Sequence, residues 1–285
     1  MSQPGEWPPQ PGLHLAEWSC ELLGTALLLL GGLSAVCLDF GPHSPLRGLG
    51  SSVRLLLTGL LFAGTGSLLA ISPLGRRSGA HLNPVVTLAF WTQRKVHPHD
   101  LAGYVGGQLL GAVLGTAAVA GLWGGEARAV HLGATVPGRG LTGPAAMVVE
   151  AVMTAVLVLV LLLMTSSART ARWTALVLWP VIAVLVWQGA PYTGTSLNPA
   201  RSLGPALLVP LLGPYWVYVA GPLLGGAVAV GGFALLRDRQ VLTAKLFHDP
   251  RYRSTLGTSL AQWAAAADQV GSNPGLSVGP PGFVG

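Results

Sequence analysis

Two Asn-Pro pairs lie inside apolar sequence, Asn83-Pro84 and Asn198-Pro199. Proline disfavours a helical residue before it but suits the first turn of a new helix, so each pair predicts a short helix with Asn at its N-cap. In a membrane, such a break is tolerated only where it is buried in protein or lines a cavity. One pair in each half of the chain therefore indicates a pore or a transport site.

Three charged side chains also fall in apolar sequence. Arg201 follows the second Asn-Pro pair, and Glu21 and Glu150 lie within long apolar runs. A charge at membrane depth is costly and normally faces water or a polar partner, so each of these residues is a candidate functional group. For the two glutamates, a role in proton transport is one of the alternatives.

The composition is that of a membrane protein. Charged residues make up 9% of the 285 residues and hydrophobic residues 51%, whereas soluble domains average roughly 25% charged. The net charge of +6 comes from basic residues in the loops, which is typical of a chain with a cytoplasmic excess of Lys and Arg and not of a nucleic-acid-binding protein. The histidines and cysteines show no metal-ligand spacing, and Ser196 and His81 have no third partner, so we expect no metal, no cofactor and no enzyme.

The elements that must position these residues can be read from run lengths. A span needs roughly 20 apolar residues to cross about 30 Å of hydrocarbon. The stretches 82–91 and 197–208 are too short to cross and predict re-entrant half-helices, so we expect an all-α membrane protein. The six predicted spans are 15–36, 52–71, 101–122, 145–166, 173–190 and 213–236.

The chain also repeats itself. Asn83-Pro84 recurs 115 residues later as Asn198-Pro199, and Glu21 in the first span is matched by Glu150 in the fourth. Three spans and one half-helix, used twice over about 15–122 and 145–236, predict an inverted repeat, because an odd number of spans reverses the entry side of the second copy. The two half-helices should then enter from opposite faces.

The ends of the chain are polar. Residues 1–14 form an N-terminal segment, and residues 237–285 form a tail that we expect to be partly disordered, with a basic stretch from Arg237 to Arg253 as a lipid-facing anchor. If residue 1 is cytoplasmic, eleven Lys and Arg residues fall inside and five outside, which predicts that both termini are cytoplasmic.

The segments SGAHLNPVVT and GTSLNPARSLGPAL resemble the aquaporin and glycerol-facilitator family, the major intrinsic proteins, over roughly residues 15–236. One departure is Val85, where the family usually has Ala. The resemblance, which is to bacterial-type members, implies a passive, proton-excluding water channel in the inner or plasma membrane, assembled as a homotetramer. It assigns the pore motifs to Asn83, Pro84, Val85, Asn198, Pro199 and Ala200.

The resemblance also implies a selectivity filter and a supporting shell. Arg201, Val186 and Thr195 would be filter walls, with Ala63 as the fourth wall, or Phe62 if the register shifts by one residue. The residues that would support the half-helices and their loops are Glu21, Glu150, Gln108 and His81.

The expected filter residues do not identify a single solute. Val186 stands where orthodox water channels usually have His, and it predicts a wider opening, whereas Ser202 and Ala206 are typical of water channels. We expect a water channel with a broadened filter. The alternative is a facilitator of glycerol, ammonia or hydrogen peroxide. A secondary transporter is disfavoured, because no carboxylate lies next to either Asn-Pro pair.

Overall fold

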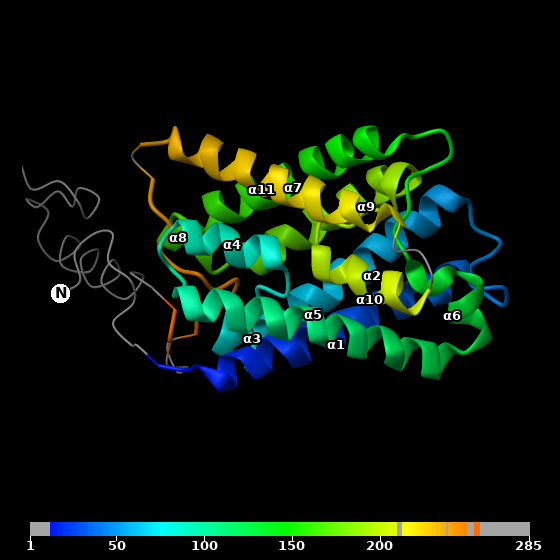
Figure 1. Ribbon diagram of the computed structural model, residues 1–285, viewed down its shortest axis with the longest axis horizontal. Helices are drawn as coiled ribbons and strands as arrows, with labels where there is room; N and C mark the ends of the chain where they lie inside the picture. Colours follow the sequence, from blue (N-terminus) through cyan, green and yellow to red (C-terminus); the bar gives the residue numbers. More distant parts are fainter. Residues whose placement is uncertain (1–11, 210–212, 238, 250–253, 257–285) are drawn as a thin grey trace, which may run out of the picture.

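A computed structural model describes residues 12–209, 213–237, 239–249 and 254–256, and its regular elements are helices (Figure 1). Six helices are long and apolar enough to cross a membrane, which confirms the predicted all-α architecture. They are α1 (Leu15–Phe40), α2 (Ser51–Ile71), α5 (Pro98–Trp123), α7 (Gly143–Thr165), α9 (Thr174–Thr193) and α11 (Val217–Ala234).

Two short helices follow the Asn-Pro pairs, α4 (Pro84–Thr92) and α10 (Pro199–Leu208). Figure 1 shows α4 in one half of the bundle and α10 in the other. Both begin at the proline, two residues later than the runs 82–91 and 197–208 predicted, because the residues before each Asn-Pro pair have left-handed backbone. The smaller elements are α3 (Pro73–Ser78), α6 (Gly125–Ala129), α8 (Ala168–Ala171), η1 (His131–Gly133) and η2 (Gly213–Trp216).

The observed spans differ from the predicted ones mainly at their ends. Helix α5 begins at Pro98 and not at 101, since proline suits the first turn of a helix. The predicted run 213–236 divides into the turn η2 and helix α11, which ends at Ala234. Helix α1 continues to Phe40, four residues past its predicted end.

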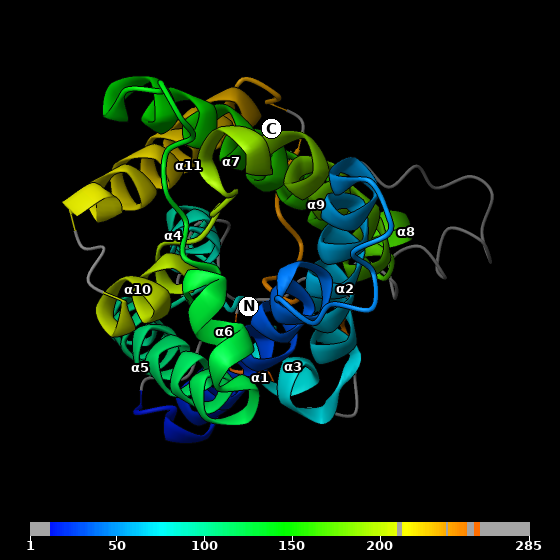
Figure 2. The same ribbon diagram turned by 90° about the vertical axis from the view of Figure 1, so that its right-hand side faces the viewer.

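The helices form a ring around a central axis (Figure 2). Helix α1 packs on α5 and α2, α2 packs on α9, and α9 packs on α7, which in turn packs on α11. The half-helices complete the ring, since α10 and α4 both contact α5 and α11. The two repeats thus hold the half-helices between their third spans.

Close packing within each repeat depends on glycine. A Cβ at Gly111 would collide with the Leu22 carbonyl oxygen, and a Cβ at Gly225 would collide with that of Ala151. These contacts join α5 to α1 and α11 to α7, and small residues are what allow two membrane helices to approach so closely. Their equivalence in the two halves is a direct expression of the repeat.

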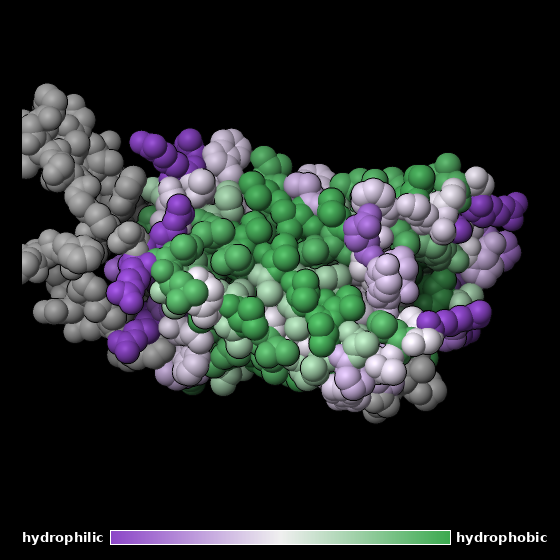
Figure 3. Space-filling view, turned by 90° about the horizontal axis from the view of Figure 1, so that it is seen from above, coloured by the Kyte–Doolittle hydropathy of each residue, from purple (hydrophilic) through white to green (hydrophobic). Residues whose placement is uncertain are grey.

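The outer surface carries an apolar belt between two polar ends (Figure 3). Leu110 and Leu114 of α5, Val148 and Val152 of α7 and Val228 of α11 are exposed. Such a continuous apolar exterior is unfavourable in water and suits a lipid environment. The chain is therefore a multi-pass membrane protein.

We call the end of the bundle where α1 begins the proximal end, and the opposite end the distal end. Residues 239–249 return to the proximal end after α11: the Leu242 N–H donates to the Thr165 carbonyl at 2.9 Å, and the Leu246 N–H donates to the Gly79 carbonyl at 3.1 Å. Val241, Leu242 and Lys245 are buried. The expectation of a lipid-facing anchor from Arg237 to Arg253 is wrong here, because this segment packs on protein backbone; residues 238, 250–253 and 257–285 lie outside the described residues.

Candidate functional site: a pore between two half-helices

The two Asn side chains connect the half-helices to each other. The Asn83 Nδ2 donates to the Leu197 carbonyl at 2.9 Å, and the Asn198 Nδ2 donates to the Leu82 carbonyl at 2.8 Å. Each side-chain oxygen caps its own helix, with Asn83 Oδ1 accepting from the Val85 N–H and Asn198 Oδ1 from the Ala200 N–H. A primary amide has two N–H donors, so each Asn retains one beyond this reciprocal pair.

The backbone before each Asn is held in a strained conformation. Ala80 and Leu82 have φ of 55° and 50°, and their counterparts Thr195 and Leu197 have φ of 50° and 57°. Non-glycine residues in this left-handed region cost about 1–3 kcal/mol each and persist only where the surroundings impose them. The same left-handed pair therefore precedes each Asn-Pro motif, at equivalent positions of the two repeats.

The Glu21 carboxylate accepts the hydrogen bonds that the first of these loops donates. Its Oε1 accepts from the Ser78 hydroxyl at 2.7 Å and the His81 N–H at 3.1 Å, and its Oε2 accepts from the Leu82 N–H at 2.7 Å. Gln108 joins the same carboxylate, with its Nε2 donating to Oε2 at 2.8 Å. These are the contacts that a supporting role requires.

The Glu150 carboxylate accepts the hydrogen bonds of the second loop in the same way. Its Oε1 accepts from the Thr193 hydroxyl at 2.7 Å and the Ser196 N–H at 2.9 Å, and its Oε2 accepts from the Leu197 N–H at 2.9 Å. Equivalent carboxylates of α1 and α7 therefore accept backbone N–H groups that each left-handed loop leaves without a helical partner.

One tyrosine supports each loop, a role that the residue type alone does not reveal. The Tyr104 hydroxyl donates to the Ser78 carbonyl at 2.7 Å, and the Tyr218 hydroxyl donates to the Thr193 carbonyl at 2.9 Å. The 114-residue offset between the two tyrosines is that of the repeat and is the signal that could have paired them.

A cavity of about 400 Å³ runs along the bundle between the loops. Asn83 and Asn198 line it near its middle, and Phe40 and Val130 line it toward the distal end. The cavity passes both Asn-Pro motifs, so one path connects the two half-helix N-termini.

Arg201 lies in the wall of this cavity toward the distal end. It is 7% exposed, its Nη1 donates to the Gly133 carbonyl at 2.7 Å, and its guanidinium carbon lies 5.5 Å from the centroid of the Phe62 ring. A carbonyl partner and an aromatic face both stabilise a buried guanidinium. Gly133 belongs to a loop that no motif in the chain associates with the pore.

The other proposed filter residues lie along the same cavity. Ala63, Val186 and Thr195 line it together with Arg201, and Phe62 lines it as well. The sequence did not decide whether Phe62 or Ala63 is the fourth filter wall, and the structure shows why, because both residues line the cavity. The Phe62 ring also lies against Gly32 of α1, where a Cβ would collide with the ring.

At the proximal end, the returning segment contributes to the cavity wall. Leu246 lines the cavity together with Ala80, His81 and Leu82. His81 contacts this segment directly, with its Nε2 2.7 Å from the Ala244 carbonyl oxygen, and its Nδ1 lies 3.2 Å from the Thr87 hydroxyl. His81 thus connects the loop before Asn83 to the segment 239–249.

Lys245 anchors this segment from inside the protein. Its side chain is fully buried, and its Nζ donates to the Arg76 carbonyl at 2.6 Å. Burial lowers the pKa of Lys245 from 10.5 to about 8, although the carboxylates of Glu17 and Asp249 favour its charged form. The segment is therefore held partly by a group that titrates just above neutral pH.

Comparisons with known proteins agree with this geometry. A family model described as "Major intrinsic protein" matches residues 13–233. "Aquaporin NIP1-1" of Zea mays is 31% identical over 220 residues, which are 76% of this chain and 73% of the relative. "Glycerol uptake facilitator protein-like 6" of Lactiplantibacillus plantarum is 31% identical over 222 residues, which are 75% of this chain and 95% of the relative. The X-ray structure of the aquaglyceroporin from Plasmodium falciparum shares the fold, with a TM-score of 0.65 at 23% identity, covering 78% of this chain and 96% of that one.

Proposed function

The chain belongs to the major intrinsic protein family, and on that premise we propose that its cavity is a passive water pore that excludes protons and ions. Members of this family are channels for water or small solutes and are not enzymes. The observation that carries the proposal is the reciprocal pair of Asn side chains, which fixes two amide groups at one point of the path.

The Asn pair gives the pore its means of excluding protons. Each half-helix N-terminus carries about half a positive charge, and both lie near the middle of the cavity. A water molecule whose oxygen accepts from the remaining N–H groups of Asn83 and Asn198 turns its own hydrogens away along the pore. This orientation interrupts a chain of hydrogen-bonded waters, and the positive field repels H₃O⁺ and other cations.

Arg201 adds a second barrier toward the distal end. Its guanidinium is fixed by the Gly133 carbonyl and therefore presents a permanent positive charge and hydrogen-bond donors to the passing solute. A cation that has shed water at this point meets direct repulsion, whereas a neutral solute gains a hydrogen-bond partner.

The other residues of the filter support an opening that is wider than the opening of the narrowest water pores. Ala63 and Val186 are small or apolar, so they leave room and offer no hydrogen bond, while Thr195 supplies a hydroxyl. The Phe62 ring near Arg201 supplies bulk on one side. We assign water as the main solute. Glycerol, ammonia or hydrogen peroxide is the second candidate, and the specific observation that favours it is that Ala63 and Val186 line the cavity together with Arg201.

The setting of the channel is proposed from charge and from family membership. The excess of Lys and Arg in the loops of the proximal end supports a cytoplasmic location for that end and for both termini, with the protein in the inner or plasma membrane. Each subunit would carry its own pore within a homotetramer. Cross-linking in mild detergent tests the assembly, and recovery of monomers alone would contradict it.

The experiment that tests the function is stopped-flow light scattering on proteoliposomes. A sucrose gradient should give shrinkage well above that of empty liposomes, with no proton flux under a pH gradient. A rate equal to that of empty liposomes would refute a channel, and uptake that saturates and follows an ion gradient would indicate a transporter instead.

A glycerol gradient then tests the filter. Re-swelling after the initial shrinkage would show that glycerol passes, and the double variant Ala63→Phe/Val186→His should abolish it while water flux persists. A matched control is Leu110→Phe on the lipid-facing surface, which should change neither rate. Re-swelling that survives the double variant would place the filter elsewhere.

A further inference from the structure

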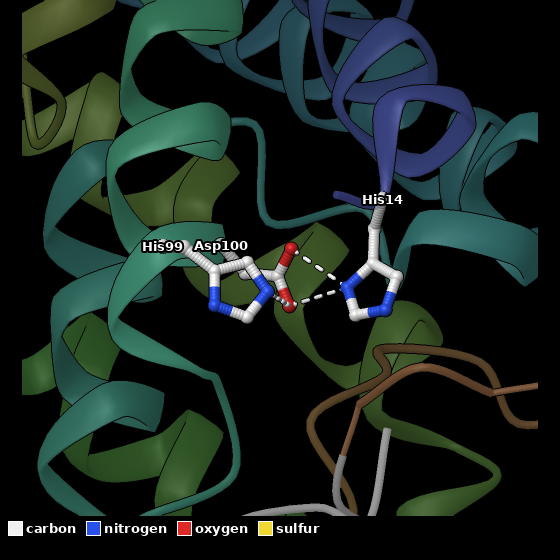
Figure 4. A group of neighbouring side chains, drawn as sticks. All are labelled: His14, His99 and Asp100. Carbon is white, nitrogen blue, oxygen red and sulfur yellow. Dashed lines mark hydrogen bonds and ion pairs between the residues drawn. The ribbon is translucent and has the colours of Figure 1, made fainter. Parts of the chain in front are cut away.

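A cluster of ionisable side chains lies at the proximal end, away from the pore. His14 immediately precedes α1, and His99 and Asp100 are in the first turn of α5. Figure 4 shows the two imidazole rings on either side of the Asp100 carboxylate, each with a nitrogen directed toward it. The three ligand atoms lie within 4.8 Å of one another.

The spacing of these atoms is close to that of a coordination sphere. His14 Nδ1 lies 2.8 Å from Asp100 Oδ2, and His99 Nε2 lies 3.7 Å from the same oxygen. Ligands about 2.0–2.1 Å from a tetrahedral zinc ion are roughly 3.3 Å apart. Both distances to Asp100 Oδ2 therefore need to change by only about 0.5 Å, within the freedom of side-chain torsions. The distance between the two histidine nitrogens, which is at most 4.8 Å, must shorten by at most about 1.5 Å.

The cluster is held as metal sites usually are. Asp100 is fully buried, and its Oδ1 accepts from the Trp18 indole N–H at 2.7 Å, which fixes the carboxylate. His14 Nδ1 lies 2.9 Å from Oδ1 and 2.8 Å from Oδ2, and His99 Nε2 lies on the Oδ2 side. Such outer partners orient ligands and tune affinity. The His97 ring stacks on His99 with centroids 5.0 Å apart, which limits the rotation of the His99 ring.

One ligand nitrogen has no other role among the described residues. His99 Nε2 is buried as an atom and makes no hydrogen bond there, because 3.7 Å is too long for one. A buried, unsatisfied imidazole nitrogen is costly and calls for a physical reason. The His99 side chain as a whole is 34% exposed, so the cluster lies near the surface of the proximal end.

We propose that His14, His99 and Asp100 form a binding site for a divalent transition-metal ion, with Zn²⁺ as the best match. Two imidazoles and one carboxylate suit Zn²⁺, whereas Mg²⁺ and Ca²⁺ prefer oxygen ligands only. With three protein ligands, a water completes the tetrahedron. The bound ion joins the beginning of α1 to the beginning of α5, and it stabilises the fold by linkage, since the unfolded chain lacks the preformed site.

The test is calorimetric titration of Zn²⁺ into the full, untagged chain in mild detergent after treatment with a chelator. We expect one Zn²⁺ per chain, no comparable binding of Mg²⁺, and a higher thermal unfolding temperature with Zn²⁺. Co²⁺ as a spectroscopic substitute should give the strong visible absorption of a tetrahedral site.

The variants make the result specific to this cluster. His99→Ala and Asp100→Asn should each weaken Zn²⁺ binding by roughly tenfold or more and remove the Co²⁺ band. Asp100→Asn keeps an oxygen for Trp18, and His99 Nε2 makes no hydrogen bond, so both variants should retain water flux in liposomes. The matched control is His43→Ala, which removes a histidine paired with Glu126 at the distal end. Absence of stoichiometric binding, binding unchanged in both cluster variants, or an equal loss in the control would overturn the proposal.

Discussion

The departure at Val85 has a structural counterpart that can be tested by mutation. Val85 is 1% exposed, and a Cβ added at Gly226 of α11 would lie 2.5 Å from its Cγ1. Atoms cannot remain this close, and the β-branched Val85 side chain has few alternative rotamers within a helix. Gly226→Ala should therefore force α4 away from α11.

The magnitudes follow from packing. Overpacking of this kind costs about 1–3 kcal/mol, so Gly226→Ala should destabilise the protein by that amount. Val85→Ala removes two buried methyl groups and should cost about 1–3 kcal/mol in lost contacts. In the double variant the methyl group introduced at position 226 occupies the space that the valine vacates, so its cost should be smaller than the sum by about 1–3 kcal/mol.

The assay is unfolding in mixed micelles of mild and denaturing detergent, followed by tryptophan fluorescence. Gly231→Ala, in the same helix, is the control, because a Cβ there meets no atom within 4 Å. It should be neutral or stabilise by roughly 0.5–1 kcal/mol through helix propensity. Costs of Val85→Ala and Gly226→Ala that add within about 0.5 kcal/mol would refute the contact.

Three further predictions concern the loops and the proximal end. Glu150→Gln should destabilise the protein by about 1–3 kcal/mol and lower water flux without revealing a proton flux, because its new N–H₂ group faces backbone donors; loss of a measurable proton flux with water flux intact would instead indicate proton transport. The pKa of Lys245 is about 8 when segment 239–249 is docked and 10.5 when the side chain is in water. Between these pH values Lys245 is more often protonated in the released segment than in the docked one. Raising the pH from about 8 to 10.5 should therefore strengthen the docking of the segment. A spin label at Gln240 should report this tightening, and Lys245→Met should remove the pH dependence. Leu246→Ala should raise water permeability in stopped-flow measurements with solute selectivity unchanged, and an unchanged rate would mean that Leu246 does not limit flux.

The sequence was sufficient for the frame of the molecule and for the centre of the pore. Span lengths and the repeated Asn-Pro pairs predicted six crossing helices and two half-helices, because the membrane sets the length of each element. The reciprocal contacts of Asn83 and Asn198 follow from an inverted repeat, which brings equivalent positions together. These features depend on local pattern and symmetry, and both can be read from one chain.

Features that depend on tertiary contacts could not be read in this way. The segment 239–249 looked like a lipid anchor, but backbone hydrogen bonds to Thr165 and Gly79 decide its position, and no residue pattern encodes them. His14 and Asp100 are 86 residues apart and fit no spacing rule for metal ligands. Apolar periodicity in α2 could not assign the filter wall to Phe62 or to Ala63, and in the structure both residues line the cavity.

The cross-connection between the half-helices has a consequence for how the protein is made. The Leu197 carbonyl that receives the Asn83 amide lies 114 residues further along the chain, and the Leu82 carbonyl must likewise wait for Asn198. During synthesis, the first three spans can enter the membrane while their half-helix still lacks its partner. Its final seating is then deferred until α9 and α10 have been inserted, so the first half of the molecule matures only when the second half arrives.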